Sequence, residues 1–237
     1  MQLILASNFF NDFQQKFYND FIAKDRWIFL WDGLCNTLKI TIFALIIGTI
    51  IGFFVAIIRS TYEATGKLKI LNFFCNIYLT LIRGTPVVVQ LLIINFIIFA
   101  SYNNKILAGI LCFGINSGAY VAEIFRSGIM SIDKGQMEAG RSLGFNYMQT
   151  MILIIMPQAL KNVLPALGNE MVVLVKETAV SGYIAIQDLT KAGDIIRSQT
   201  YDAFLPLIGV ATIYLIITMF MTMLIKKFER KLRNSEH

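Results

Sequence analysis

The feature that most constrains this chain is a set of long apolar runs that contain no charged side chain. Residues 40–58 hold no Asp, Glu, Lys or Arg, and Lys39 and Arg59 bound the run. A helix needs about 20 apolar residues to cross the hydrocarbon of a bilayer. With 56% hydrophobic and 15% charged residues among 237, the chain has more apolar side chains than one soluble core can bury. The sequence predicts an all-α integral membrane protein and argues against a soluble enzyme.

Other apolar runs supply the remaining spans. Two plain runs cover residues 106–125 and 203–225. The run at 70–100 is too long for one straight span. The sequence Arg83-Gly84-Thr85-Pro86 interrupts this run, so its helix either breaks there or extends well outside the hydrocarbon. Hydropathy alone leaves residues 142–188 open between one span and two, which gives five or six spans in all.

The distribution of basic residues favours five spans. In that arrangement the segments on one side hold 12 Lys and Arg, and those on the other side hold 6. Because loops on the cytoplasmic side are enriched in Lys and Arg, we predict an extracytoplasmic N-terminus and a cytoplasmic C-terminus. The predicted cytoplasmic segments are 59–69, 126–161 and 226–237.

The N-terminal part differs from the spans. Phenylalanines recur at every fourth position from Phe9, with Asp and Lys between them, and Trp27 and Trp31 follow. We predict that residues 8–31 form one amphipathic helix in the membrane interface, with aromatic rings at headgroup level. Residues 1–15 carry no Lys or Arg, so no cleavable signal is expected. The predicted divisions are an interfacial segment (1–33), a transmembrane domain (34–228) and a cytoplasmic basic tail (229–237).

The sequence lacks the residue patterns of familiar catalytic and metal sites. His237 is the only histidine, and Cys35, Cys75 and Cys112 show no Cys-x-x-Cys spacing. No phosphate-binding glycine loop, nucleophile elbow or zinc-protease motif is present. The basic residues that give the net charge of +6 fall between the apolar runs, so no nucleic-acid partner is expected. We expect no catalytic site, metal or cofactor in this chain, and any ATP to bind another chain.

The most informative stretch follows the third predicted span. The sequence Glu138-Ala139-Gly140-Arg141-Ser142-Leu143-Gly144 predicts a short polar helix that ends at a glycine. Nine residues later comes Ile154-Ile155-Met156-Pro157. Small residues on an exposed helix let another protein approach closely, and Glu138 can pair with a basic side chain of that partner. The stretch therefore predicts a docking surface for a soluble motor.

This stretch resembles the docking loop of ABC importer permeases, where Glu-Ala-Ala-x-x-x-Gly is followed after nine residues by Ile-x-Leu-Pro. Here Gly140 replaces an alanine and Met156 replaces the leucine. The resemblance covers roughly residues 33–228 and is to the permeases for polar amino acids. Its further residues are 81–86, 90–91, 118–126, 143–144, 157–159, 164–165, Asn169 and 176–178.

The resemblance implies a five-span subunit of type I importer fold in a bacterial plasma membrane. It implies two cytoplasmic ATP-binding subunits that carry ATP and Mg²⁺, a second permease copy or a sister permease, an extracytoplasmic solute-binding protein and an amino acid substrate. It also places 145–160 at the cytoplasmic interface and 164–187 across the membrane. The chain itself would move substrate inward by alternating access within the lipid bilayer.

The resemblance further implies a coupling helix at about 136–146. A glycine inside a helix costs about 0.5–1 kcal/mol against alanine, so Gly140 is expected to soften it. The residues expected to contact the ATP-binding subunit are Glu138, Ala139, Gly140, Ser142, Leu143 and Gly144.

Ionisable and polar residues within the spans are candidates for the substrate path. A zwitterionic amino acid needs a cation for its carboxylate and an anion for its ammonium. Arg83 suits the first role and Glu123 the second, unless the two are structural, in an ion pair or at the membrane interface. Thr85 and Gln90 lie beside the interruption of the second span, where they either line the path or pack helices.

The last candidates lie in the fourth span. Glu170 and Glu177 are seven residues apart and share a helix face, whereas Lys176 lies off that face. Carboxylates that face a dimer axis would favour cationic substrates, and carboxylates paired with basic residues elsewhere would be structural. Both interpretations stay open.

Two other functions also stay open. A secondary transporter acting alone would need no docking loop, and such folds commonly contain two related halves, which this sequence does not reveal. A permease of the same architecture for methionine or an oxyanion would differ only in cargo.

Overall fold

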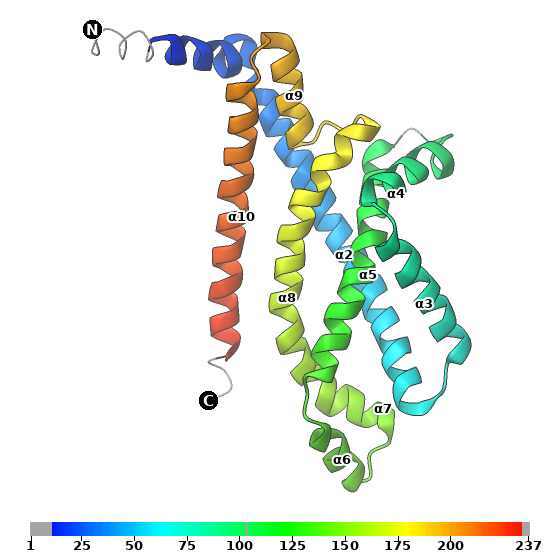
Figure 1. Cartoon of the computed structure of the whole chain (residues 1–237). Coiled ribbons are helices and arrows are strands. Elements are labelled where there is room, and N and C mark those ends of the chain that lie inside the picture. The colour runs from blue at the N-terminus through cyan, green and yellow to red at the C-terminus, as the bar shows by residue number, and fades with distance from the viewer. Residues whose placement is uncertain (1–10, 103, 234–237) are drawn as a thin grey trace.

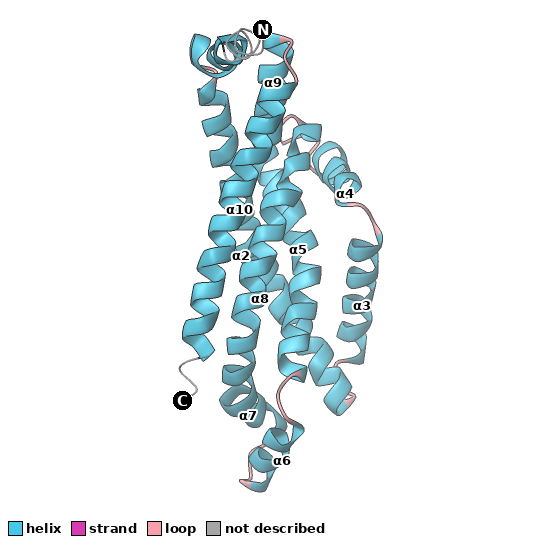
Figure 2. Ribbon diagram, turned by 60° about the vertical axis from the view of Figure 1, so that its left-hand side comes forward, coloured by secondary structure: helices cyan, strands magenta, loops and turns pink. Residues whose placement is uncertain are grey.

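A computed structural model of the chain describes residues 11–102 and 104–233. Within these ranges every regular element is a helix, and loops only connect helices (Figure 2). Four helices are long and apolar enough to cross a membrane, or five if a bent pair counts as one span. The long helices form an elongated bundle, and the short helix α6 (Lys134–Ser142) lies at one end of it (Figure 1). The predicted all-α membrane class is confirmed.

The centre of the bundle is the contact between α2 (Trp27–Thr65) and α5 (Lys105–Met130). A Cβ atom at Gly52 would lie 2.6 Å from Cγ1 of Val121, and one at Gly114 would lie 2.8 Å from the partner helix. Only glycine lets these two helices approach so closely, as at many helix contacts in membranes. The largest buried cluster around this contact includes Ile40, Leu91, Phe113, Leu174 and Ile184.

The second predicted span is broken. Helix α3 (Lys69–Gly84) ends before Thr85 and Pro86, and α4 (Val87–Ile93) continues as the π-helical turn η3 (Ile94–Ile98). The two parts are bent by 108°. Because Pro86 has no N–H and its ring disfavours helical geometry at the preceding residue, the helix breaks at this point. Of the two predicted alternatives, the structure has the broken helix.

Residues 142–188 supply one span rather than two. Helix α7 (Tyr147–Thr150), the π-helical turn η4 (Met151–Ile155), α8 (Met156–Glu177) and the 3₁₀ turn η5 (Thr178–Ile184) follow one another. Together they make a single candidate span of 38 residues. Figure 1 shows α7 beside α6 at one end of the bundle and α8 running along it. The total is therefore five spans when the bent pair counts as one.

Two helices complete the bundle. Helix α9 (Leu189–Thr200) is anchored to α2, because the Leu189 N–H donates to Oγ1 of Thr37 at 3.1 Å and Nδ2 of Asn36 donates to a backbone carbonyl just before α9 at 2.9 Å. Helix α10 (Phe204–Arg233) then runs back towards the end where α6 lies (Figure 1).

The predicted amphipathic helix at 8–31 is wrong in its extent. Residues 11–17 are helical, but a π-helical turn (η1, Tyr18–Ile22) and a 3₁₀ turn (η2, Ala23–Asp25) follow. Lys24 and Asp25 have φ angles of 59° and 53°. These angles lie in the left-handed region, which glycine usually occupies, and no glycine occurs at this turn to indicate it in the sequence.

The consequence is that Trp27 and Trp31 belong to the first turns of α2. The N-terminal segment, residues 11–25, lies across the end of the bundle opposite α6 (Figure 1). Phe21 packs there against Ile196 and Leu205. Phe9 and His237 lie outside the described residues.

Candidate functional site

The predicted docking helix is α6, and both of its ends are fixed by hydrogen bonds. The Asp133 carboxylate accepts from a backbone N–H of the first turn at 2.7 Å. At the other end the Gly144 N–H donates to the Arg141 carbonyl at 3.0 Å, and the Phe145 N–H donates to the Gly140 carbonyl at 3.1 Å. This pair of bonds, with φ of +86° at Gly144, is a Schellman motif. The helix therefore ends at a glycine, as its sequence predicts.

Gly140 does more than soften the helix. It is buried, and a Cβ atom there would lie 2.5 Å from Cγ2 of Thr150 on α7. Helix α7 begins with a capping box between Asn146 and Gln149, with both hydrogen bonds at 2.9 Å. Two capped helices thus meet at the glycine, and this contact holds α6 in place.

The other docking candidates point away from the chain. Glu138, Ala139 and Ser142 are exposed, and Leu143 is 74% exposed at the C-terminus of α6. Gly144 is also exposed in the turn that follows. Five of the six predicted docking residues therefore form an outward surface, and Gly140 supports it from within.

Glu123 is the centre of an arginine cluster in the bundle. Its Oε1 lies 3.0 Å from Nη1 of Arg59 and 3.7 Å from Nη1 of Arg83, and its Oε2 lies 2.9 Å from Nη2 of Arg126. Three guanidinium groups share one carboxylate that is 26% exposed. The cluster therefore carries excess positive charge, and it ties α2, α3 and α5 together.

Arg83 and Glu123, predicted to bind opposite ends of a substrate, are thus in contact with each other. The Arg83 guanidinium also lies over the ring of Tyr120, 5.8 Å from its centroid. Sequence analysis missed the roles of Arg59 and Arg126. The spacing of Glu123 and Arg126, three residues apart on a helix, was a signal for their pairing, but nothing local connects Arg59 with a residue 64 positions away.

Thr85 and Gln90 hold the broken span together. Nε2 of Gln90 donates to the carbonyls of Ile82 and Thr85 at 2.8 and 3.0 Å, and Oε1 of Gln90 accepts from Asn116 of α5 at 3.0 Å. A helix break leaves carbonyls without helical donors, and these must be satisfied inside a membrane. Gln90 is buried and provides that donor. Asn116 is a hydrogen-bond partner of Gln90 that sequence analysis missed.

Glu170 and Lys176 have different surroundings. Glu170 is buried, and its Oε1 accepts from the Ser117 hydroxyl at 2.8 Å. Lys176 is exposed and lines a shallow depression of about 330 Å³ against α10.

A groove of about 530 Å³ lies between α5 and α8. It brings Glu123 and Glu170 together, although 47 residues separate them in the sequence. The other four predicted path residues do not line it: Arg83, Thr85, Gln90 and Lys176. Its polar lining residues are Tyr120, Glu123, Ser127, Ser131, Asn162 and Glu170.

Known proteins resemble this chain in sequence and in fold. The family described as "Binding-protein-dependent transport system inner membrane component" matches residues 48–234. A putative glutamine transport system permease protein of Rickettsia typhi is 38% identical over 86% of this chain and 93% of that protein. The arginine transport system permease protein of Bacillus subtilis is 35% identical over 88% and 94%.

A solved structure has the same fold. It is described as the crystal structure of an amino acid ABC transporter with histidines, and it is 41% identical. The match covers 89% of this chain and 98% of that one, with a TM-score of 0.81. This chain belongs to the family of inner-membrane components of binding-protein-dependent transport systems.

Proposed function

We propose that this chain is the permease subunit of an ATP-driven importer for polar or charged amino acids. Relatives named for glutamine and arginine transport, together with the amino acid transporter structure, support this substrate class over methionine or an oxyanion. We assign most of the selection among these amino acids to the separate binding protein.

The observation that carries the coupling mechanism is the outward surface of α6. The helix is capped at both ends and held by Gly140, so it can transmit force without unfolding. We propose that it contacts one of two ATP-binding subunits, which hold ATP and Mg²⁺. ATP binding draws the two coupling helices of a permease pair together, and rigid-body motion then opens the path to the extracytoplasmic binding protein. The pair is either two copies of this chain or this chain with a sister permease.

The orientation that we propose for the chain in the membrane follows from this mechanism. The end with α6 lies in the cytoplasm, and the N-terminal segment lies at the opposite membrane surface. Helix α10 ends on the cytoplasmic side with its basic residues, in agreement with the distribution of Lys and Arg. The chain itself supplies a gate, a path and a docking helix, and it performs no chemistry on the substrate or on ATP.

We propose the groove between α5 and α8 as the substrate path. Arg83, which lies over Tyr120 of the groove and has the longest of the three distances to Glu123, is the cation for the substrate carboxylate. Glu123 is engaged by three guanidinium groups, so we assign the substrate ammonium to Glu170. Thr85 and Gln90 stabilise the broken span, and Lys176 lies outside this path.

Substitution of Glu138 tests the docking assignment. Glu138→Lys reverses an exposed charge on α6 and should reduce co-purification of the ATP-binding subunit while membrane insertion stays intact. Glu229→Lys reverses an exposed charge on α10 and serves as the matched control. Undiminished co-purification of Glu138→Lys would remove α6 from the interface. Uptake by the purified chain alone, without nucleotide, would instead indicate a secondary transporter.

Substitution of Glu170 tests the substrate path. In the reconstituted complex, Glu170→Gln should lower uptake of an amino acid about tenfold, because a charge-assisted hydrogen bond contributes about 1.5–3 kcal/mol. Lys176→Gln, on the same helix but outside the groove, should leave uptake unchanged. Equal uptake by wild type and Glu170→Gln would rule out this carboxylate as the ammonium partner.

A further inference from the structure

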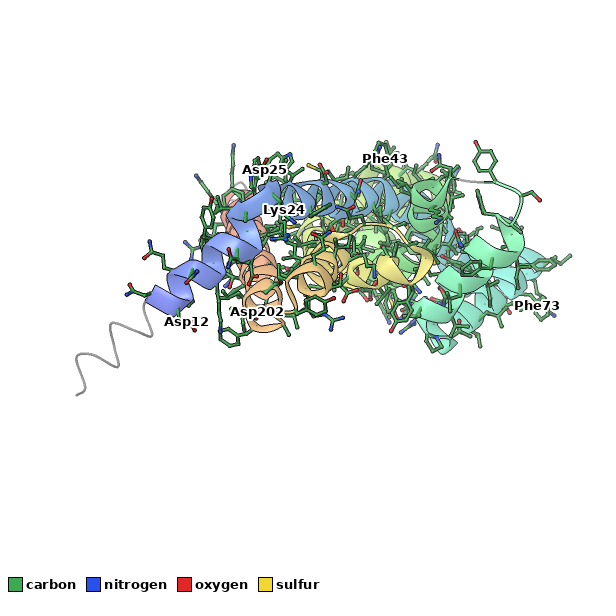
Figure 3. All side chains as sticks on the ribbon, turned by 90° about the horizontal axis from the view of Figure 1, so that it is seen from above. Asp12, Lys24, Asp25, Phe43, Phe73 and Asp202 are labelled. Atoms are coloured by element: carbon green, nitrogen blue, oxygen red, sulfur yellow. The ribbon has the colours of Figure 1, made fainter. Side chains whose placement is uncertain are left out.

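A second pocket lies at the end of the bundle opposite α6, far from the docking helix, and about half of its lining comes from residues 16–26, which precede the family match. It has a volume of about 690 Å³ and lies between the N-terminal segment and the link from α9 to α10. Figure 3 looks onto this end, with Lys24 on the N-terminal segment and Asp202 on the link. The polar residues that line it are Lys16, Asn19, Asp20, Lys24, Arg26, Thr200, Tyr201 and Asp202.

The pocket contains a buried carboxylate. Asp20 is only 2% exposed, and its Oδ2 atom has no hydrogen-bond partner among the described residues. Asp202 differs, because its Oδ1 accepts the Phe204 N–H at 2.8 Å as it caps α10. Burial raises the pKa of Asp20 above its ordinary value. An ammonium group beside Oδ2 would supply the missing donor in a charge-assisted hydrogen bond.

Basic side chains surround this carboxylate. Arg26 is 8% exposed, and it is held by Oε1 of Gln199, at 3.1 Å from Nε, and by the Asn19 carbonyl. Lys16 and Lys24 are exposed residues of the same pocket. The pocket therefore offers one buried anion and three cations. This combination fits a ligand with an ammonium group and an oxyanion a few atoms apart.

The surroundings indicate where such a ligand comes from. Large aromatic side chains are exposed on both sides of the turn, with exposed fractions of 43% at Phe13, 46% at Phe17, 49% at Trp27 and 60% at Trp31. Exposed aromatic rings at the end of a membrane span lie at headgroup level. The pocket is thus positioned in the layer where lipid headgroups lie.

We propose that this pocket binds the headgroup of a phosphatidylethanolamine lipid, with the ammonium on Asp20 and the phosphate on Lys24 and Arg26. A free amino acid shares the chemistry of an ammonium and an oxyanion. The lipid is favoured because its acyl chains can cover the exposed aromatic side chains beside the pocket. The bound lipid would hold the N-terminal segment against the link between α9 and α10.

A lipid competition experiment tests the proposal. The full-length chain, purified with its partner subunits and stripped of lipid, receives equal amounts of phosphatidylethanolamine and phosphatidylcholine with identical acyl chains, and native mass spectrometry counts the retained lipids. Phosphatidylcholine keeps the phosphate, but its quaternary ammonium has no N–H to donate. Wild type should retain phosphatidylethanolamine about tenfold more strongly, which is the effect of one charge-assisted hydrogen bond.

Two variants test the carboxylate and the basic residues of the pocket separately. Asp20→Asn should abolish the preference between the two lipids, whereas Lys24→Gln should weaken retention of both alike. Asp25→Asn, an exposed neighbour that does not line the pocket, is the matched control and should behave as wild type. Because Asp20→Asn removes a buried charge, co-purification with the ATP-binding subunit checks that the variant folds, and Lys24→Gln provides an independent test.

Several outcomes would overturn the proposal. An unchanged preference in Asp20→Asn would exclude this carboxylate, and stronger retention of phosphatidylglycerol would indicate a site for anions only. Displacement of the lipid by free glutamine or arginine would indicate a solute site. Reduced association of the extracytoplasmic binding protein in Asp20→Asn, with lipid retention unchanged, would indicate a protein contact.

Discussion

Helices α5 and α10 show opposite relations between composition and burial. In the span-forming stretch of α5 67% of the residues are buried, although this helix carries Asn116, Ser117 and several glycines. The corresponding stretch of α10 is more apolar, yet only 6% of it is buried. The order is the reverse of that in a soluble protein, because lipid is as apolar as leucine and gives no drive to hide apolar side chains. In this chain, small and polar residues indicate where helices meet.

Substitution of a glycine at the contact between α2 and α5 should cause the largest loss of stability. Gly52→Val places a branched side chain where even a Cβ atom would lie 2.6 Å from Cγ1 of Val121 and 2.7 Å from the Ala122 backbone nitrogen. Because a backbone atom cannot move aside as a side chain can, we expect a loss of about 3 kcal/mol, near the upper end for overpacking. Thermal unfolding in detergent measures it.

Gly84→Val is the matched control, because no atom lies within 4 Å of its added Cβ. Its unfolding temperature should fall much less. Equal losses in the two variants would show that general helix propensity, and not the close approach of α2 and α5, determines stability.

The sequence predicts this architecture well where the signal is local. The uncharged run at 40–58 indicates a span, and Pro86 indicates the break in the second span. The turn at Lys24 and Asp25 was missed because its left-handed backbone is formed by residues that rarely adopt it. The helix predicted at residues 8–31 was wrong in its extent for that reason.

The charged and polar sites were predicted only in part, because their partners are distant in the sequence. Glu123 and Arg83 were identified as unusual residues in spans, but Arg59 looked like the end of a span. Asn116, the partner of Gln90 on α5, lies in an ordinary apolar helix. Residue type indicates that an intramembrane polar group needs a partner, and only the packing of helices shows which one.

The junction at α9 should show a pH-dependent effect. Asp188 caps α9 and accepts the Thr190 N–H at 2.9 Å, yet burial raises its pKa from 3.8 to about 6. The ionised form is thus disfavoured in the folded chain. This destabilisation is fully present above pH 6 and is relieved as the pH falls from about 6 to about 4. Asp188→Asn keeps the cap and should be more stable than wild type at pH 8, by about 2–3 kcal/mol from the size of the shift.

Unfolding at a series of pH values checks this expectation. The advantage of Asp188→Asn should fall steadily from pH 6 to pH 4, because the carboxyl group of the folded wild type is then protonated and no longer buried as a charge. Asp133→Asn removes an exposed capping carboxylate on α6 and controls for the loss of a charge as such. An advantage of Asp188→Asn that is the same at pH 4 and pH 8 would show that charge is not its cause.

The smallest change in stability is expected for a substitution on α10. Ile216 is 61% exposed on this helix, and we expect it to face lipid. Ile216→Ala then replaces one apolar surface in contact with acyl chains by another, so unfolding should change by about 0.5 kcal/mol or less. Thermal unfolding and size-exclusion chromatography of the purified complex measure stability and assembly together. A loss of subunits in Ile216→Ala would place a protein surface on this face. The exposed side chains of α10 would then belong to an interface between permease subunits rather than to a surface in contact with lipid.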